Sequence, residues 1–274
     1  MSAAVDLSEF ETGSHRGVVS YPGMIFSVGH DPEVTDHFVR RGANYLDIGN
    51  YEYTYNAGDK GIRYRYGFVA IKLERRMPHL VLDSNKNNFL GATQLPVGYS
   101  SKQRISLEGN FDEYFTMYCP QGYQTDALYV FTPDLMALMI DEALTVDAEV
   151  VDDWLFLYHF GGFDLSDPSI LTKLFRIIDT VGAKMLRRTD RYADPRTSFA
   201  TPTALEARAS SGFDRMATNH VAPDGARLKR GMSPPVKIAV WVVSIVLGSA
   251  VVFGVVVMVD AVLDAVTNFG TPSF

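Results

Sequence analysis

The sequence contains six carboxylates within 13 consecutive positions, a group that could bind a metal or take part in catalysis. They are Asp141, Glu142, Asp147, Glu149, Asp152 and Asp153. Carboxylates at this density can bind a divalent cation or act together as a general acid and base. Neither EF-hand spacing nor histidines at helical spacing accompany them, and a solvated connection between a helix and a strand explains the same composition. We therefore expect no metal site and no catalytic carboxylate pair here.

The other residue types that carry catalysis are scattered. The six histidines include one pair seven residues apart, His30 and His37, but a helix start expected at Asp31 leaves His30 outside that helix. G-x-S-x-G, S-x-x-K and Walker patterns are missing. Cys119 is the single cysteine and is flanked by Tyr118 and Pro120, which is typical of a small apolar residue. We expect no enzymatic activity, no catalytic or metal-binding residue and no cofactor.

Tyrosine is concentrated in the first third of the chain, at positions 45, 51, 53, 55, 64 and 66. These rings could form a binding face for a ligand or a protein. They could also pair across strands and support a sheet, as aromatic residues on hairpins commonly do. The sequence leaves both interpretations open and favours support of the sheet.

Hydrophobic periodicity predicts mixed strands and helices up to residue 188. Two alternating segments, 43–56 and 62–73, flank a Gly-Asp-Lys-Gly turn and predict an antiparallel hairpin. Asp or Thr followed by Pro predicts helix starts at residues 31, 132 and 167. The expected fold class is α+β, an antiparallel or mixed sheet covered by two or three helices. The expected helices are 31–41, 111–118, 132–144 and 167–188, and the further strands are 79–83, 104–108, 127–131 and 149–160.

Charge is distributed unevenly along the chain. Residues 1–183 carry 14 Lys and Arg against 25 Asp and Glu, a net charge of −11, whereas residues 184–237 carry 11 against 5, a net charge of +6. The acidic body is a poor partner for the phosphates of nucleic acid, so we expect no nucleic-acid binding.

Residues 238–259 read IAVWVVSIVLGSAVVFGVVVMV and contain no charged side chain. As a helix at about 1.5 Å per residue, this segment spans about 33 Å, enough to cross a hydrocarbon core of about 30 Å. A helix of this length in a soluble protein would carry a polar face. We therefore predict one transmembrane helix within residues 236–263, in contact with the lipid bilayer.

Basic residues flank this segment on one side only. No Lys or Arg occurs in residues 260–274, and cationic flanks stay on the cytoplasmic side of a membrane. No signal-peptide pattern opens the sequence, so we expect a cytoplasmic N-terminal domain, a cell-membrane location and an external C-terminus. Trp241 lies where an interfacial aromatic residue is expected. The basic flank, expected to set topology and to face lipid headgroups, is Arg227, Lys229, Arg230 and Lys237.

Small residues recur at helical spacing within the predicted span. Ser244 and Gly248 are four residues apart, and so are Ala250 and Gly254. This spacing lets a second helix approach closely, although such residues are common in membrane helices. We expect an integral membrane protein to contact this face.

Residues 189–235 are rich in Ala, Ser, Thr and Pro and poor in large apolar residues. This composition predicts a basic linker that is disordered or draped on another surface. The expected organisation is a flexible leader at 1–20, a cytoplasmic α+β domain at 21–188, the linker at 189–235, the transmembrane helix at 236–263 and a short external tail at 264–274.

Four stretches of the sequence resemble an uncharacterised family of actinobacterial membrane-anchored proteins. They are Met77–His79, Ser106–Phe111, Thr132–Ala143 and Asp152–Tyr158. The resemblance covers about residues 40–160 and implies a cytoplasmic α+β domain of unknown function joined to membrane helices. The matching positions are a helix start, an apolar helix and a tryptophan-containing strand, so the resemblance implies no catalytic residue.

These features predict a non-catalytic single-pass membrane protein that serves as an accessory or scaffold subunit of a larger membrane complex. A respiratory-chain assembly is one candidate host. The alternative is a membrane-tethered enzyme or small-ligand-binding domain, with its pocket between the tyrosine hairpin and the acidic end of the helix at 132–144.

Overall fold

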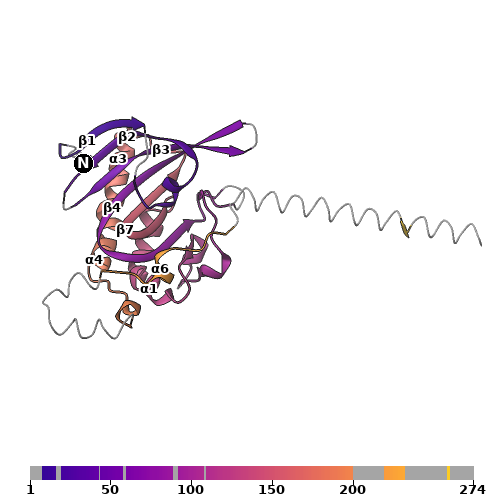
Figure 1. Ribbon diagram of the computed structural model, residues 1–274. Helices are drawn as coiled ribbons and strands as arrows, with labels where there is room; N and C mark the ends of the chain where they lie inside the picture. Colours follow the sequence, from indigo (N-terminus) through magenta and orange to yellow (C-terminus); the bar gives the residue numbers. More distant parts are fainter. Residues whose placement is uncertain are drawn as a thin grey trace, which may run out of the picture. The chain divides into compact units, whose positions relative to one another are not determined.

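Strand β4 (Lys60–Ser84), 25 residues long, is the element on which the rest of the sheet assembles. β3 (Leu46–Ala57) pairs with its first half, and β6 (Phe115–Tyr118) pairs with its last four residues. β7 (Asp147–Phe160) pairs along the opposite edge of both halves. The outer strands are β2 (His30–Arg40), β1 (Glu11–Arg16) and β5 (Arg104–Ile105), which give the order β1-β2-β3-β4-β6-β5 with β7 beside β4 (Figure 1).

The computed structural model describes residues 8–16, 20–42, 44–57, 60–88, 92–107, 109–199, 219–231 and 258–259. The chain divides into two units, Met1–Gly231 and Met232–Phe274, and every element discussed below belongs to the first.

The helices of this unit fall mainly between β6 and β7 and after β7. A π-helical turn, η4 (Ile178–Gly182), joins α3 to α4, so these two form one continuous helical segment. The α-helices are α1 (Gln124–Val130), α2 (Pro133–Glu142), α3 (Pro168–Ile177), α4 (Ala183–Thr189) and the short α6 (Pro223–Ala226). The short 3-10 turns are η1 (Met24–Ser27), η2 (Ser101–Gln103), η3 (Phe111–Glu113) and η5 (Pro195–Phe199).

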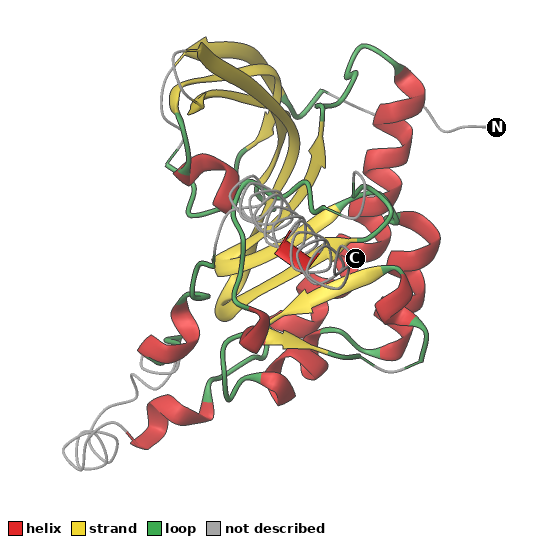
Figure 2. Cartoon of the chain, turned by 90° about the vertical axis from the view of Figure 1, so that its right-hand side faces the viewer, coloured by secondary structure: helices red, strands yellow, loops and turns green. Residues whose placement is uncertain are grey.

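Successive side chains of the central strands point to opposite faces of the sheet, and an apolar cluster buries each face. On the helix-covered face, Ile71 and Leu157 pack among apolar residues of α1, α2, α3 and α4. On the loop-covered face, Phe68 packs in a cluster that includes η1, the segment 92–103 and Leu228. Figure 2 shows the strands from another side, with long helical segments along their right.

The predicted α+β class is confirmed, and every strand pair that the structure describes is antiparallel. The predicted tyrosine hairpin is β3 and the first half of β4, paired from Leu46 opposite Ile71 to Ala57 opposite Lys60. The strand expected at 79–83 is the second half of the same long β4, because register shifts between Lys72 and Leu80 bend it without ending its pairing with β7.

Two predicted helices and one predicted strand at the end of the domain are also confirmed. The helix expected at 132–144 is α2, and the helix expected at 167–188 is α3 with α4. Asp167 caps α3 as the sequence predicts, since its side chain accepts the N–H of Ser169 at 2.8 Å. The strand expected at 149–160 is β7.

The helix predicted from Asp31-Pro32 is wrong, because these residues begin the strand β2. Asp31 and Asp36 take left-handed φ values of 52° and 49°, near irregularities in the pairing with β3. Such values are tolerated by aspartate better than by most residues. Val34 and Val39 are buried between β1 and β3, so pairing across the sheet overrides the local helix-start pattern.

Two short apolar segments are assigned to the wrong class by the sequence. Residues 111–118, expected as a helix, form the turn η3 and then β6, whose Phe115 and Met117 are buried at alternate positions. Residues 127–131, expected as a strand, lie mostly in α1, which buries Ala127 and Val130. Over such short runs, periodicity does not separate a helix from a strand.

The structure also differs from the predicted domain boundaries at residues 20 and 188. Within the predicted leader, residues 11–16 form the edge strand β1. Within the predicted linker, Tyr192 and Asp194 are buried against α1 and the residues before it. Residues 219–231, which we call the strap, carry the buried Leu228 into the loop-covered cluster. These segments belong to the packed domain because they bury apolar and hydrogen-bonded side chains in it.

The predicted transmembrane helix lies outside the described residues except for residues 258–259. Among the described residues, no helix is long and apolar enough to cross a membrane. Lys237 of the flank, the predicted interfacial Trp241 and the predicted contact face also lie outside the described residues; the contact face is Ser244, Gly248, Ala250 and Gly254.

The close packing at Gly67 in β4 gives a test of this fold. A Cβ at Gly67 would lie 2.4 Å from the ring of Phe163, which is buried and stacked on His159. Gly67→Ala should therefore lower the free energy of unfolding by about 1–3 kcal/mol, measured by urea denaturation of the full chain in detergent. Gly13→Ala is the matched control, because a Cβ there meets nothing within 4 Å. Equal stabilities of the two variants would contradict the described packing.

Candidate functional site

The strap (residues 219–231) lies against β4 and η2 and is held there by hydrogen bonds along its length. Near its start, Asn219 Oδ1 accepts the backbone N–H of Arg76 at 2.7 Å. Near its end, Lys229 and Gln103 exchange two bonds: the Lys229 N–H donates to Gln103 Oε1 at 2.8 Å, and Gln103 Nε2 donates to the Lys229 carbonyl at 2.9 Å. The two bonds at Lys229 use the backbone of the strap and the bond at Asn219 uses a side chain, so the strap is held at both ends.

A buried histidine and a buried carboxylate meet under the middle of the strap. His79 of β4 accepts the backbone N–H of Leu228 at Nδ1, at 3.0 Å, so the imidazole proton resides on Nε2. Nε2 donates to Glu149 Oε1 at 2.8 Å. His79 is 6% exposed and Glu149 1% exposed. A neutral imidazole therefore connects the strap to a carboxylate on β7.

Glu149 collects two further donors at its second oxygen. The backbone N–H of Met24 and the hydroxyl of Tyr158 each donate to Oε2 at 2.7 Å. Burial and the neighbouring carboxylate raise the pKa of Tyr158 well above its ordinary value, which keeps its hydroxyl a donor. The network thus joins η1, β4, β7 and the strap. Removing the donor of His79 would leave Glu149 Oε1 without the donor described here, at a cost typical of a buried unsatisfied acceptor.

Three of the four residues of the predicted basic flank lie in the strap. Arg227 makes a bidentate ion pair with Asp152 of β7, with Nη1 to Oδ1 at 3.0 Å and Nη2 to Oδ2 at 2.7 Å. The Arg227 guanidinium holds the pKa of Asp152 below its usual value. Arg230 Nη2 donates to Ser27 Oγ at 2.8 Å, while Lys229 is bound through its backbone. Arg227 is thus engaged within the domain, and the role of the flank in topology stays a prediction.

The six carboxylates grouped in the sequence are dispersed in the structure. Asp147 and Glu149 are fully buried on the loop-covered side of β7. Among the described residues, no group of three or more His, Cys, Asp or Glu side chains could hold a metal ion. The other ion pairs of the group are Asp152 with Arg227, Asp153 with Lys72 and Glu142 with Arg176.

Asp147 is a buried acid that lies near a second buried acid, Asp83. Its carboxyl accepts the backbone N–H of Ser84 at 2.8 Å and the side-chain amide of Asn87 at 2.9 Å. Burial and the charge of Asp83 raise the pKa of Asp147 well above its ordinary value. This residue therefore holds the start of β7 to the end of β4 rather than facing solvent as the sequence suggests.

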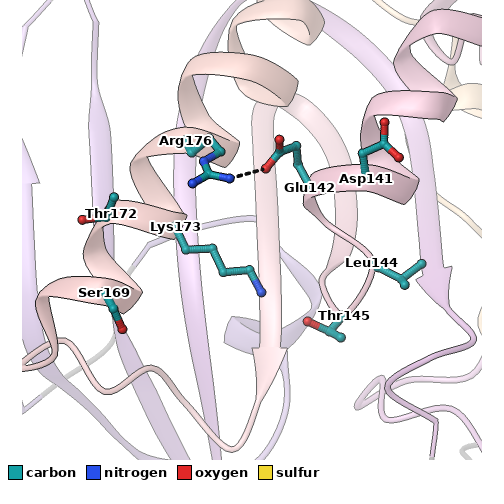
Figure 3. A pocket seen from close by; sticks show the side chains of 8 residues that line it. All are labelled: Asp141, Glu142, Leu144, Thr145, Ser169, Thr172, Lys173 and Arg176. Atoms are coloured by element: carbon teal, nitrogen blue, oxygen red, sulfur yellow. Dashed lines mark ion pairs between the residues drawn. The ribbon is translucent and has the colours of Figure 1, made fainter. Parts of the chain in front are cut away.

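A groove of about 470 Å³ lies between the end of α2 and the start of α3 (Figure 3). Asp141 and Glu142 line it from α2, and Lys173 and Arg176 line it from α3. Arg176 pairs with Glu142 at 3.6 Å. The groove includes the acidic helix end expected for a ligand pocket, but no tyrosine of the β3–β4 hairpin lines it.

The hairpin tyrosines pair with one another across strands, as the favoured interpretation of the sequence predicts. Tyr53 stacks on Tyr64 at 5.5 Å and 14° and on Tyr66 at 6.2 Å and 5°. The Tyr66 hydroxyl donates to the Gln94 carbonyl at 2.6 Å and so holds the covering segment on the sheet. Tyr55, farther along the hairpin, is 43% exposed.

Sequence reasoning misses the link between the strap and the buried network. His79 and Leu228 are 149 residues apart, and Gln103 and Lys229 are 126 apart. No local periodicity reports contacts over such distances. The one signal in the sequence is Leu228, a large apolar residue among charged neighbours in a segment otherwise typical of a linker.

Replacing Asp152 tests how the strap is held. Asp152→Asn keeps a residue that tolerates the left-handed φ of 53° at this position but removes the charge that Arg227 binds. Because half of the Arg227 side chain is exposed, we expect a loss of about 1 kcal/mol or less, seen as up to about fivefold faster hydrogen exchange of the Leu228 and Lys229 amides. Asp153→Asn, which loses only the pair with Lys72, is the control and should leave these amides unchanged. Equal exchange in both variants would contradict this role of the ion pair.

Burial of Cys119 gives a pH-dependent prediction. Burial raises the pKa of its thiol from 9.0 to about 11. Between these values the unfolded chain releases the thiol proton while the folded chain keeps it, so stability must fall as pH rises. From pH 8 to pH 10, wild type should lose about 1 kcal/mol more stability than Cys119→Ala in urea unfolding of the full chain. Parallel curves for the two proteins would show that the thiol titrates normally.

Comparisons with known proteins give no family for this chain. No family model, curated protein or solved structure matches it. The resemblance to actinobacterial membrane-anchored proteins therefore stays a prediction from the sequence.

Proposed function

We propose that this chain is a non-catalytic single-pass membrane protein that serves as an accessory or scaffold subunit of a larger membrane complex. The unit built on β4 is the cytoplasmic domain, the apolar segment 238–259 crosses the cell membrane, and the C-terminus lies outside. The partners are the lipid bilayer and an integral membrane protein. A respiratory-chain assembly is one host of this kind.

The observation that carries this proposal is the attachment of the strap. The Gly231 N–H donates to the Gly98 carbonyl at 2.8 Å, so the domain still holds the chain at this residue. Only residues 232–237 separate Gly231 from the apolar segment. At no more than about 3.6 Å per residue, this connection spans at most about 25 Å. Such a domain stays beside the membrane, which suits a subunit that covers the cytoplasmic face of a complex.

The chemistry of the buried groups supports a structural role for the domain. Glu149 has its oxygens engaged by three donors from the protein, and Asp147 is held by Ser84 and Asn87. The raised pKa of Cys119, about 11, keeps its thiol protonated at neutral pH. The two buried carboxylates, a group that serves as a base in many enzymes, are thus engaged in hydrogen bonds within the domain.

The groove between α2 and α3 favours a second function, a membrane-tethered domain that binds a small ligand. It presents carboxylates on one side and cations on the other, which suits a ligand that carries both charges. A thermal-shift screen of the full chain in detergent against nucleotides, metals and lipids tests this alternative, and a flat result across the panel would count heavily against it.

Purification from native membranes in mild detergent tests the main proposal. The full chain should resist alkaline extraction from membranes and should migrate with other integral membrane proteins identified by mass spectrometry. Gly248→Leu and Gly254→Leu should lower recovery of the partner several-fold, because larger side chains keep a second helix away. Val242→Leu and Val256→Leu, on the opposite side of an ideal helix, are matched controls.

Migration of the wild-type chain alone as a monomer would contradict the role as a subunit. Release by alkaline extraction would contradict the membrane anchor itself.

A further inference from the structure

Exposed apolar side chains gather at the far end of the β3–β4 hairpin. Tyr55 and Ile62 lie directly opposite each other and are 43% and 47% exposed. Phe160, at the end of β7, is 37% exposed, and its ring lies 6.4 Å from that of Tyr64. Side chains alternate along each strand, so all four point to the loop-covered side, beyond the residues that cover it. We call these four residues the aromatic tip.

The opposite side of the same hairpin is charged. Arg63 Nε pairs with Glu52 at 2.5 Å, and Arg65 Nε lies 3.6 Å from the same carboxylate. Arg63 also reaches Glu33 of β2 at 2.6 Å. The end of the hairpin is therefore amphipathic, with rings and an aliphatic side chain on one face and an ion-pair network on the other. Elements of this composition are typical of the boundary between lipid and water.

The aromatic tip lies near the point where the strap ends. Arg230 Nη2 donates to Ser27 Oγ at 2.8 Å, at the end of η1. Two residues later, Gly29 packs so closely that a Cβ there would lie 2.3 Å from the ring of Tyr53. Tyr53 in turn stacks on Tyr64 of the aromatic tip. The end of the strap and the aromatic tip are thus linked by consecutive contacts on one face of the domain.

We propose that the aromatic tip inserts into the headgroup region of the bilayer that the apolar segment 238–259 crosses. This inference rests on the proposed function, because it requires that segment to be a membrane anchor. Tyrosine and phenylalanine are suited to the interface, where a ring meets lipid and a hydroxyl meets water. The connection of at most about 25 Å keeps the tip at a high effective concentration near the bilayer, so a small apolar surface is sufficient for contact.

A fluorescent probe at Ile62 tests this contact in the full chain. Ile62→Cys, labelled with an environment-sensitive NBD group, is reconstituted in nanodiscs of neutral phosphatidylcholine, which removes any attraction of the basic strap to anionic lipid. Leu128→Cys is the matched control, because Leu128 is 44% exposed but lies on α1, whose buried residues face the helix-covered core. The native Cys119 is 1% exposed and should not be labelled.

We expect the probe at residue 62 to emit at shorter wavelength than the probe at residue 128 and to be quenched several-fold more by lipids that carry a nitroxide near the headgroup. Tyr55→Ser in the Ile62→Cys background should reduce this quenching with little change in the melting temperature, since Tyr55 is 43% exposed.

Equal, weak quenching at both positions in a chain that resists alkaline extraction would overturn the inference and leave the membrane anchor intact. Quenching that arises at residue 62 only after membrane proteins are added would also overturn it, in favour of a protein contact. A chain that fails to enter nanodiscs would instead overturn the proposed function on which the inference rests.

Discussion

The buried carboxylate of Glu149 is the interaction on which the loop-covered half of the domain depends. It accepts hydrogen bonds from His79, Met24 and Tyr158, which belong to β4, η1 and β7. His79 in turn accepts the backbone N–H of Leu228 in the strap. A hydrogen bond to a charged group contributes about 1.5–3 kcal/mol, and an unsatisfied buried charge costs more. Segments with few apolar residues can therefore stay ordered on this face, although the helix-covered face holds the larger apolar cluster.

The bend of β4 places this carboxylate where the covering segments meet. β7 follows β4 through the register shifts between Lys72 and Leu80, and Asp152 takes a left-handed φ opposite Met77 in the same region. The bulge brings Asp152 to Arg227 of the strap, and His79 and Glu149 lie just beyond it along the two strands. The strap thus binds at the irregular part of the sheet.

An Asp-Pro pattern predicts a helix correctly where the residues after it also have the helical spacing of apolar side chains. It fails where those residues are buried as a strand. Asp167-Pro168 begins a true helix because Leu174, Ile177 and Val181 continue the helical period into the core. Asp31-Pro32 begins a strand, because the valines that follow are buried between two neighbouring strands.

The hairpin is predictable from its alternating tyrosines, whereas the site is not predictable from local patterns. The partners of the strap in β4, β7, η1 and η2 are 75 to 203 residues away from it in sequence, and a chain segment rich in small residues carries no periodic signal of such contacts.

Attachment of the strap shortens the free part of the predicted linker. A free segment from residue 189 to 235 would give the domain a wide reach, whereas a strap held to Gly231 leaves only residues 232–237 as a connection. The proposals of a subunit beside the membrane and of an aromatic tip in the lipid interface both depend on this difference.

Hydrogen exchange of the Leu228 amide in the full chain, reconstituted in a bilayer, tests this central claim most directly. We expect slow exchange, with protection comparable to that of amides in β4 and β7, because this N–H is buried and donates to His79. Exchange at the rate of an unstructured peptide would contradict the account, since the strap would then be free and the connection to the membrane long.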